Sequence, residues 1–437
     1  MIPKEQLKEI ITSNRGFILN QVSAVIPREG IVYSQRLKKA VVLYGVRRSG
    51  KTFILYDLFK RSADHSLYID FEDERLAGFE LNDFESLEEA FLELNPQLVD
   101  KKKCFFLDEV QNIPGWERFC RRAVEKGNTE VFVTGSSSKI MPREIHTSLR
   151  GRAWSIEIDT FSFKEYLKAK TIGSSNDVIY GSKKAILKRH FVEYLKWGGF
   201  PEVVFAETEF EKIKILKEYF GSLFFKDLVE RFQINNIPLL DLMTHTIFAA
   251  FSQKLSLTAF YKQFKTTMPF SKDSLFSYYK YFLQSMLTFE VRKFSRSVYR
   301  RMRNPAKVYL VDTGLAKKVT PADQGRLLEN LVFLELRRRT DQIFYFEENR
   351  ECDFVAETRG KLSLYQVCFE LNQTSREREI EGLLDGCKQL GLREGCILTF
   401  DQEEEFSKDR VKIKVVPAWK WILTAPKDAG IQVYGHH

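Results

Sequence analysis

A glycine-containing turn near residue 50 carries the residue types that bind phosphate. Residues 45–52 read GVRRSGKT, which matches the pattern GxxxxGK[ST], and they lie between an apolar run and a helix-like segment. Glycines allow successive amides to point at one anion, and the N-terminus of the following helix adds its positive end. A basic loop that binds nothing is the alternative. We expect these residues to surround the phosphates of ATP, with Lys51 on the β- and γ-phosphates and Thr52 on Mg²⁺: Gly45, Val46, Arg47, Arg48, Ser49, Gly50, Lys51 and Thr52.

Two adjacent acids follow an apolar run 57 positions after Lys51, in the segment CFFLDE at residues 104–109. At the carboxyl edge of a neighbouring strand, Asp108 can hold Mg²⁺ through water. Glu109 can then polarise the water that attacks the γ-phosphate. The alternative is a strand that runs into an N-cap aspartate. The spacing predicts a catalytic role for Glu109 and Lys51 and a metal-binding role for Thr52 and Asp108.

Two further groups are candidates for the same site. The segment Thr134-Gly135-Ser136-Ser137 ends an apolar run, and a hydroxyl there, that of Ser136, can orient the attacking water or sense the γ-phosphate. A serine N-cap of a helix explains the same residues equally well. Arg152 can stabilise charge on the transferring phosphate if a neighbouring subunit supplies it, which requires a homo-oligomer. A solvated surface arginine is the alternative.

The apolar runs predict an α/β fold in three parts. Runs at residues 40–45, 66–71, 104–109, 130–135 and 153–158 alternate with helix-like stretches, which indicates a parallel sheet covered on both faces. Helical spacing dominates from about residue 183 to 290, and strand-like runs return between 305 and 416. We predict a P-loop domain at residues 1–180, a helical middle at 181–304 and a C-terminal α/β domain at 305–437.

Several segments together resemble a known family. These are YGVRRSGKT, YIDFED, FFLDEVQNIPGWE, VFVTGSSS, LRGRAWSIEIDTFSFKEYL and KWGGFPEV. The combination is similar to the AAA+-type P-loop ATPases of archaea and bacteria, and more narrowly to the group that couples this ATPase to a C-terminal domain of unknown function. The resemblance implies a winged helix after the ATPase domain, and then a restriction-endonuclease-like domain.

A basic segment at residues 292–307 is the candidate nucleic-acid surface. It follows two helix-like stretches at 255–264 and 271–286, an order that a winged helix uses, and it contains no acidic residue. Such a run binds phosphate backbones by releasing counterions, without reading sequence. An acidic surface of this protein or of a partner is the alternative target. We expect DNA contacts from Arg292, Lys293, Arg296, Arg300, Arg301 and Arg303, and Lys307 ends the same run.

The C-terminal part carries an incomplete nuclease pattern. The resemblance implies a helical Glu, a strand Asp, and then Glu or Gln, one residue, and Lys on the next strand. Glu329, Asp353 and Gln366 fit the first three positions, but Cys368 stands where the lysine is required. A thiol supplies no stable positive charge, and charge stabilisation is usually the largest catalytic contribution. We therefore predict a catalytically degenerate site that serves as a scaffold or as a DNA-holding surface.

Composition excludes several classes of protein. With 437 residues, 44% hydrophobic and 14% aromatic, the chain has apolar mass for several cores, which excludes wholesale disorder. No stretch approaches the roughly 18 apolar residues of a membrane helix, and no signal peptide is visible, so we expect no membrane partner. Six scattered cysteines without a CxxC pair indicate reduced thiols in a cytoplasmic protein. The net charge of +9 is modest.

These observations predict an Mg²⁺-dependent ATPase whose nucleotide state controls how a basic winged helix and a nuclease-like domain engage DNA. One alternative is a nucleotide-gated signalling or scaffold switch that binds a protein partner. Another is an ATP-regulated nuclease, which needs a second lysine such as Lys361 to replace the function absent at Cys368; no spacing in the sequence supports this.

Overall fold

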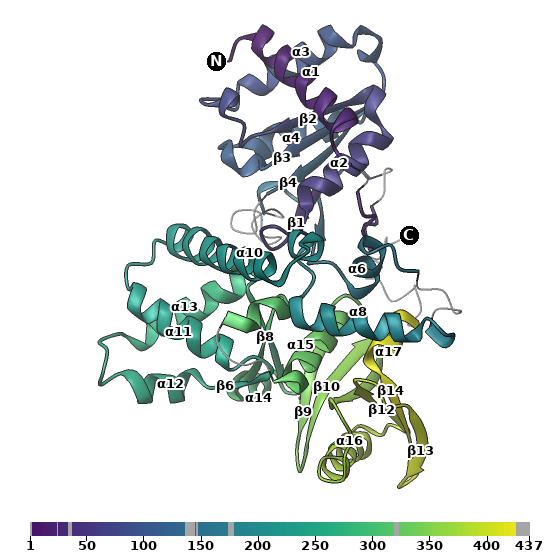
Figure 1. Cartoon of the computed structure of the whole chain (residues 1–437). Coiled ribbons are helices and arrows are strands. Elements are labelled where there is room, and N and C mark those ends of the chain that lie inside the picture. The colour runs from purple at the N-terminus through teal and green to yellow at the C-terminus, as the bar shows by residue number, and fades with distance from the viewer. Residues whose placement is uncertain are drawn as a thin grey trace. The chain divides into compact units, whose positions relative to one another are not determined.

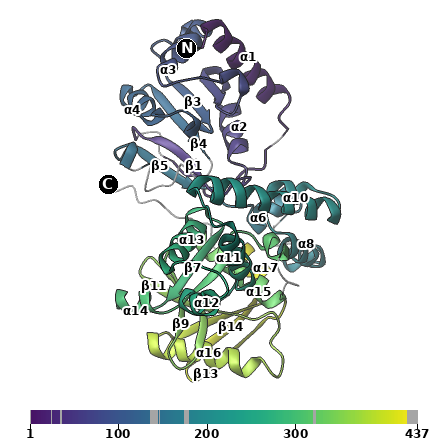
Figure 2. The same cartoon turned by 90° about the vertical axis from the view of Figure 1, so that its left-hand side faces the viewer.

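Two β-sheets organise the chain, one in each of two compact units, Met1–Asp159 and Thr160–His437. The computed structural model describes residues 2–23, 25–33, 37–135, 145, 147–173, 179–318 and 323–424. Figure 1 and Figure 2 show the elements of both units from perpendicular directions.

The sheet of the first unit is parallel throughout, in the order β2-β3-β4-β1-β5. Its strands are β1 Ala40–Tyr44, β2 Ser66–Asp70, β3 Lys103–Asp108, β4 Thr129–Thr134 and β5 Ala153–Glu157. Every boundary lies within one residue of a predicted apolar run, which confirms the parallel sheet. Because the strands are parallel, their carboxyl ends share one edge, where the turns after β1 and β3 begin and β4 ends.

Helices cover both faces of this sheet, which is why its strands are apolar on both sides. Residues of α1, α3 and α4 form one core with the sheet, and residues of α2 form another core on the opposite face. The helices are α1 Lys4–Asn20, α2 Lys51–Arg61, α3 Asp83–Leu94 and α4 Trp116–Lys126. Single 3₁₀ turns are η1 Ala63–His65, η2 Glu74–Leu76, η3 Pro96–Leu98 and η4 Val110–Asn112.

The second unit begins with helices, as the spacing from residue 183 predicts. Its helices are α6 Phe163–Ala169, α8 Lys184–Trp197, α9 Pro201–Phe205, α10 Glu209–Ser222, the π-helix η5 Leu223–Glu230, α11 Ile237–Ala249, α12 Leu257–Phe264, α13 Lys272–Gln284, α14 Val298–Arg303, η6 Thr313–Lys318, α15 Gln324–Arg337, α16 Arg376–Leu390 and α17 Ala418–Thr424. The short helix α14 lies within the basic segment at residues 292–307. None of the described helices has the length and apolar character that a membrane span requires.

A mixed sheet forms the rest of the second unit, in the order β13-β14-β12-β11-β10-β9-β7-β8-β6. Its strands are β6 Gln253–Leu255, β7 Thr288–Lys293, β8 Ala306–Leu310, β9 Ile343–Glu347, β10 Glu351–Thr358, β11 Lys361–Val367, β12 Glu394–Thr399, β13 Glu404–Lys408 and β14 Val411–Pro417. Helix α16 packs on one face. The other face meets α15 through Tyr309 stacked on Phe333, and α17 through Tyr365 against Trp421.

This sheet runs across residue 304, where the sequence predicts a domain boundary. Strands β7 and β8 lie on either side of that residue and pair with each other, while β7 also pairs with β9. The three-part division of the chain stays a prediction. In the structure, the basic segment and the nuclease-like pattern belong to one sheet.

Candidate functional site

The phosphate-type loop joins β1 to α2 and depends on two glycines. Gly45 has a φ of +149°, and a Cβ there would lie 2.2 Å from the carbonyl oxygen of Ile158. Gly50 begins α2 in the left-handed region, with a φ of +93°. Both positions exclude other residue types, so the backbone is fixed in a tight turn ahead of the helix.

Lys51 folds back across this loop. Its side chain is buried, and its ammonium donates hydrogen bonds to the carbonyl oxygens of Gly45 at 3.2 Å and Val46 at 3.1 Å. Lys51 is the one buried cation among residues 45–52, and its ammonium lies within the turn, where a phosphate-binding lysine must be.

Arg28 supports the loop from the segment that precedes β1. Its Nη1 donates to the carbonyl oxygen of Ser49 at 2.8 Å, and its Nη2 donates to that of Asp159 at 2.6 Å. The guanidinium thus joins the loop to the last residue of the first unit. Arg28 is outside the GxxxxGK[ST] pattern, and no local signal in the sequence identifies it.

Thr52 and Asp108 meet at the carboxyl edge of the sheet. The Thr52 hydroxyl lies close enough to the Asp108 carboxylate to favour its ionised form, and this carboxylate accepts hydrogen bonds from Tyr68 at 2.9 Å and from Thr134. Burial raises the pKa of Asp108 above its ordinary value, although these hydrogen bonds favour the ionised form. A hydroxyl and a carboxylate side by side fit Mg²⁺, which prefers oxygen ligands.

Glu109 follows Asp108 with a backbone in the left-handed region, at a φ of +49°. Its amide donates to the Thr134 hydroxyl oxygen and to Asp108 Oδ1, both at 3.2 Å. Its half-buried carboxylate accepts a hydrogen bond from Gln111 at 2.5 Å. The turn after β3 therefore fixes the backbone position of the predicted base.

Asp70 is an acid at this edge that sequence reasoning missed. It ends β2 directly beside Asp108, and Asp70 accepts a hydrogen bond from the Glu72 amide at 2.8 Å. Burial, and then the charge of Asp108, raise the pKa of Asp70 to about 6. Its place at the end of the run SLYID is the signal that could have identified it.

The two further candidates for this site are the Ser136 hydroxyl and Arg152. Ser136 lies outside the described residues, and Thr134 provides the hydroxyl that contacts Asp108. Arg152 precedes β5, its carbonyl accepts from the Ala40 amide, and its guanidinium pairs with Glu125 at 2.8 Å. Because Ala40 begins β1, Arg152 lies at the amino edge of the sheet, opposite the phosphate-type loop.

The basic segment is partly neutralised by neighbouring acids. Arg292 pairs with Glu290 at 2.5 Å, and Lys293 pairs with Glu348 at 3.4 Å. Arg296 is exposed. Arg303 is also exposed and lies over the ring of Tyr299, while half-buried Arg301 lies over the ring of Phe344. The side chain of Arg300 is outside the described part of the chain. The structure therefore separates paired from solvent-facing cations within one run.

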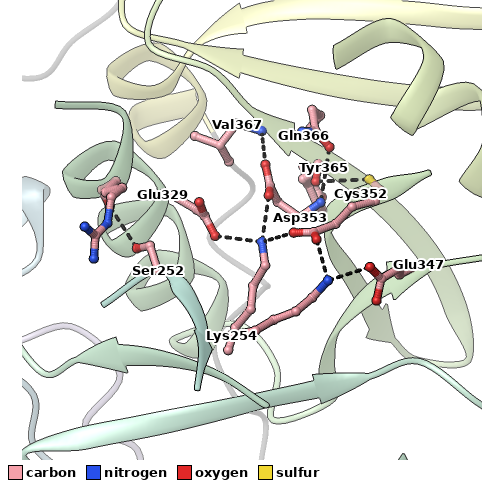
Figure 3. A network of polar contacts seen from close by, with 12 residues as sticks. Ser252, Lys254, Glu329, Glu347, Cys352, Asp353, Tyr365, Gln366 and Val367 are labelled. Carbon is pink, nitrogen blue, oxygen red and sulfur yellow. Dashed lines mark hydrogen bonds and ion pairs between the residues drawn. The ribbon is translucent and has the colours of Figure 1, made fainter. Parts of the chain in front are cut away.

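Lys307, at the end of the same run, does not face solvent. It is 3% exposed, and its ammonium contacts Glu329 at 3.1 Å, Asp353 at 2.9 Å and Glu351 at 2.7 Å. Figure 3 labels Glu329 and Asp353 in this network. Burial lowers the pKa of Lys307, but the carboxylates outweigh it and hold the pKa well above the ordinary value. A lysine therefore reaches the acidic pair from outside the predicted pattern, because β8 supplies it from 46 positions before Asp353.

The carboxylates around Lys307 are themselves held in place. Tyr309 donates to Glu329 at 2.7 Å, and burial followed by the charge of Asp353 raises the pKa of Glu329 to about 7. Asp353 sits at an irregularity in the pairing of β10 with β9, and its second oxygen accepts from the Val367 amide at 2.9 Å. As the described residues stand, with the Lys307 ammonium among the carboxylates, no three His, Cys, Asp or Glu side chains form a set that could hold a metal ion.

The other two residues of the predicted pattern have different surroundings. Gln366 accepts from the Asp353 amide at 3.1 Å and donates to Glu379 at 2.5 Å, so it joins the cluster through the backbone. The Cys368 thiol donates to the carbonyl oxygen of Glu370 at 3.0 Å. Lys361, the alternative lysine, lies at the exposed start of β11.

Family models match three parts of the chain. An AAA domain matches residues 37–167, which hold the loop, Asp108 and Glu109. A domain of unknown function (DUF8612) matches residues 188–326, and another (DUF4143) matches 324–421. The P-loop ATPase-type domain that the motifs predict is therefore confirmed.

Solved structures with similar arrangements include the Aeropyrum pernix ORC1 protein in complex with DNA. It is 13% identical, with 76% of this chain and 91% of that chain covered and a TM-score of 0.28. The Thermotoga maritima RuvB Holliday junction branch migration motor is also 13% identical, with 66% and 88% covered and a TM-score of 0.25. Similarity at this level carries no argument about function.

Curated relatives match along most of the chain. An uncharacterized protein of Haemophilus influenzae is 25% identical over 393 residues, which cover 86% of this chain and 93% of that protein. The uncharacterized protein MJ1544 of Methanocaldococcus jannaschii is 37% identical over 403 residues, which cover 88% of each chain. The chain therefore belongs to the same family as MJ1544, and it carries an AAA domain followed by two domains of unknown function.

Proposed function

We propose that the chain binds ATP with Mg²⁺ and hydrolyses it to ADP and phosphate. The observation that carries this proposal is the approach of the Thr52 hydroxyl to the Asp108 carboxylate, beside a loop that the Lys51 ammonium crosses. Lys51 would exchange its two carbonyl partners for oxygens of the β- and γ-phosphates. Thr52 would bind Mg²⁺ directly and Asp108 through water, and the metal would neutralise charge on the phosphates.

Glu109 is the proposed general base. Its carboxylate oxygen would accept a hydrogen bond from the attacking water and draw the proton away as the water approaches the γ-phosphate. The left-handed turn and the amide contact with Thr134 support this role, because they hold the residue beside Asp108.

Arg152 enters the proposal only through a second copy of the chain. Its place at the amino edge of the sheet separates it from Thr52 of its own unit. A mixture of Lys51→Ala and Arg152→Ala proteins tests this role, because the first can lend its arginine to the intact loop of the second. Turnover that exceeds the sum of the separate proteins supports a homo-oligomer, and turnover equal to that sum contradicts it.

The second part of the proposal is that nucleotide state controls DNA engagement by the basic segment. The element order α11-β6-α12-α13-β7-α14-β8, with β6, β7 and β8 paired in one sheet, supports a winged helix whose wing is residues 294–305 and contains α14. Two arginines of this wing, Arg296 and Arg303, are exposed and form no ion pair among the described residues, so their charge is available to phosphates.

A protein partner is the second candidate, favoured by one observation. Arg292 and Lys293 already bind Glu290 and Glu348, so the segment is less basic than its sequence suggests. A nucleotide-gated switch would then present the remaining cations to an acidic protein surface.

ATP turnover by the full chain, measured alone and with single-stranded, duplex or branched DNA, tests both parts. We expect Mg²⁺-dependent turnover that DNA stimulates and that Lys51→Ala abolishes. Turnover in Lys51→Ala equal to the parent would contradict the ATPase assignment. Turnover that no nucleic acid changes would contradict DNA engagement and favour the protein partner.

A further inference from the structure

Lys307 lies where two parts of the C-terminal sheet join. On one side are β6, β8 and β7, and on the other β9, β10 and the remaining strands. The backbone link between them is short: β7 and β9 pair at Arg292 with Phe344 and at Lys293 with Tyr345, and the Phe294 amide donates to the Tyr345 carbonyl oxygen. Side chains must therefore contribute to holding the two parts together.

Two lysines of the first part face four carboxylates at this joint. Lys254 on β6 is the direct cross-strand partner of Lys307 on β8, and like charges in such a position repel. Glu351 relieves this repulsion, since one of its oxygens binds Lys307 at 2.7 Å and the other binds Lys254 at 2.7 Å. Glu347 adds a second partner to Lys254 at 2.6 Å. Figure 3 shows Lys254 in contact with Glu347 within this network.

Three carboxylates engage the Lys307 ammonium. It donates hydrogen bonds to Glu329 and Asp353, and it forms an ion pair with Glu351. Most oxygens of these carboxylates also take part in a second polar contact. Glu329 Oε1 also accepts from Tyr309, and the remaining oxygens of Asp353 and Glu351 bind the Val367 amide and Lys254. A divalent cation that used these oxygens would have to displace the ammonium.

We propose that the ammonium of Lys307 serves as the resident cation of this acidic cluster, in the place where a divalent metal ion would otherwise bind, and that it ties β8 to β10 and α15. The cluster is then a joint that needs no metal, and removing the ammonium uncovers a divalent-cation site made of Glu329, Glu351 and Asp353. Carboxylates of this number and type are hard oxygen ligands that suit Mn²⁺ or Mg²⁺.

A titration with Mn²⁺ and no other ligand tests the proposal. The loss of the electron paramagnetic resonance signal of the free ion measures how much Mn²⁺ is bound. All proteins are full-length and carry Asp108→Asn, which removes the proposed cation ligand of the nucleotide site. We expect Lys307→Met to gain one Mn²⁺ site that the parent lacks, and the melting temperature of this variant to rise with Mn²⁺. The double variant Lys307→Met/Asp353→Asn should lose the new site.

The matched control is Lys412→Met, because Lys412 forms an exposed ion pair with Glu405 at 2.7 Å in the same sheet. It should bind Mn²⁺ as the parent does.

A folded Lys307→Met protein that gains no Mn²⁺ site would overturn the proposal. Mn²⁺ binding by the parent that is lost in Asp353→Asn would also overturn it. If Lys307→Met does not fold even with Mn²⁺, the test compares Mn²⁺ binding by the parent and by Asp353→Asn. Equal Mn²⁺ binding supports the proposal, and weaker Mn²⁺ binding by Asp353→Asn overturns it.

Discussion

The Thr134 hydroxyl, at the end of β4, donates a hydrogen bond to the Asp108 carboxylate at the end of β3, and both side chains are buried. The same hydroxyl oxygen accepts from the Glu109 amide. One side chain therefore positions both the proposed metal ligand and the proposed base.

Replacing Thr134 should impair hydrolysis more than nucleotide binding. We expect Thr134→Val, which keeps the shape and removes the hydroxyl, to lower kcat for ATP by about 10- to 100-fold, as loss of a supporting hydrogen bond at a metal site does. Thr134→Ser retains the hydroxyl and should stay close to the parent. Steady-state ATP turnover measures this, and equal kcat values for the valine and serine variants would count against the role.

Arg28 should affect ATP affinity. In the peptide unit between Ser49 and Gly50 the carbonyl and the amide point in opposite directions, and Arg28 holds the carbonyl. The Gly50 amide is thereby oriented as a phosphate donor. A hydrogen bond to a charged group contributes about 1.5–3 kcal/mol, so Arg28→Ala should raise KM for ATP about 10- to 100-fold, with kcat changed less. The KM of Arg28→Lys should lie between those of the parent and Arg28→Ala. An unchanged KM in the alanine variant would refute this role of Arg28.

DNA affinity should depend on the solvent-facing cations of the basic segment. We expect the double variant Arg296→Ala/Arg303→Ala to weaken duplex binding and to reduce the slope of log affinity against log salt by about 2. Arg292→Ala/Lys293→Ala removes the same charge from residues that already bind Glu290 and Glu348, so it should change the slope less. Fluorescence anisotropy at several salt concentrations measures duplex affinity and its salt dependence. Equal slopes for the two double variants would contradict the expectation.

Stability of the second unit should depend on pH through Asp312. This fully buried carboxylate accepts hydrogen bonds from the Gly199 and Gly314 amides, and burial raises its pKa from 3.8 to about 6. The folded protein binds the proton more tightly than the unfolded chain. The resulting stabilisation is complete below pH 3.8 and is lost as the pH rises through about 6, a change of ~3 kcal/mol.

Asp312→Asn should remove this dependence, because an amide does not titrate in that range. Denaturant unfolding between pH 4 and 7 should therefore show a parent free energy of unfolding that falls with pH relative to the variant. The variant also loses a hydrogen bond, which shifts its curve by a constant amount. Parallel curves for the two proteins would show that Asp312 does not titrate as described.

Most of the first unit follows from local sequence patterns. Each strand is a short apolar run, and the loop, Asp108 and Glu109 are specified by residue type and spacing, so the structure brings them to one edge as expected. Helix α1 was overlooked, although Leu7, Ile10 and Ile11 recur at helical spacing and pack in the core.

The C-terminal sheet was less predictable, because its decisive contacts join residues far apart in sequence. The nuclease pattern places a lysine at position 368, two residues after Gln366, whereas the structure brings Lys307 from a strand that precedes Glu329. A single lysine within the apolar run AKVYLVD was the one local signal. The pairing of β7 with β9, which carries the sheet across residue 304, leaves no local trace.

Calorimetric titration of ATP into the full-length chain, with and without Mg²⁺, tests the central claim most directly. The parent should bind ATP, and Mg²⁺ should strengthen binding; Asp108→Asn should lose most of the Mg²⁺ effect, and Lys51→Ala should lose binding itself. Binding by Lys51→Ala that matches the parent, or an Mg²⁺ effect that Asp108→Asn leaves intact, would contradict the account.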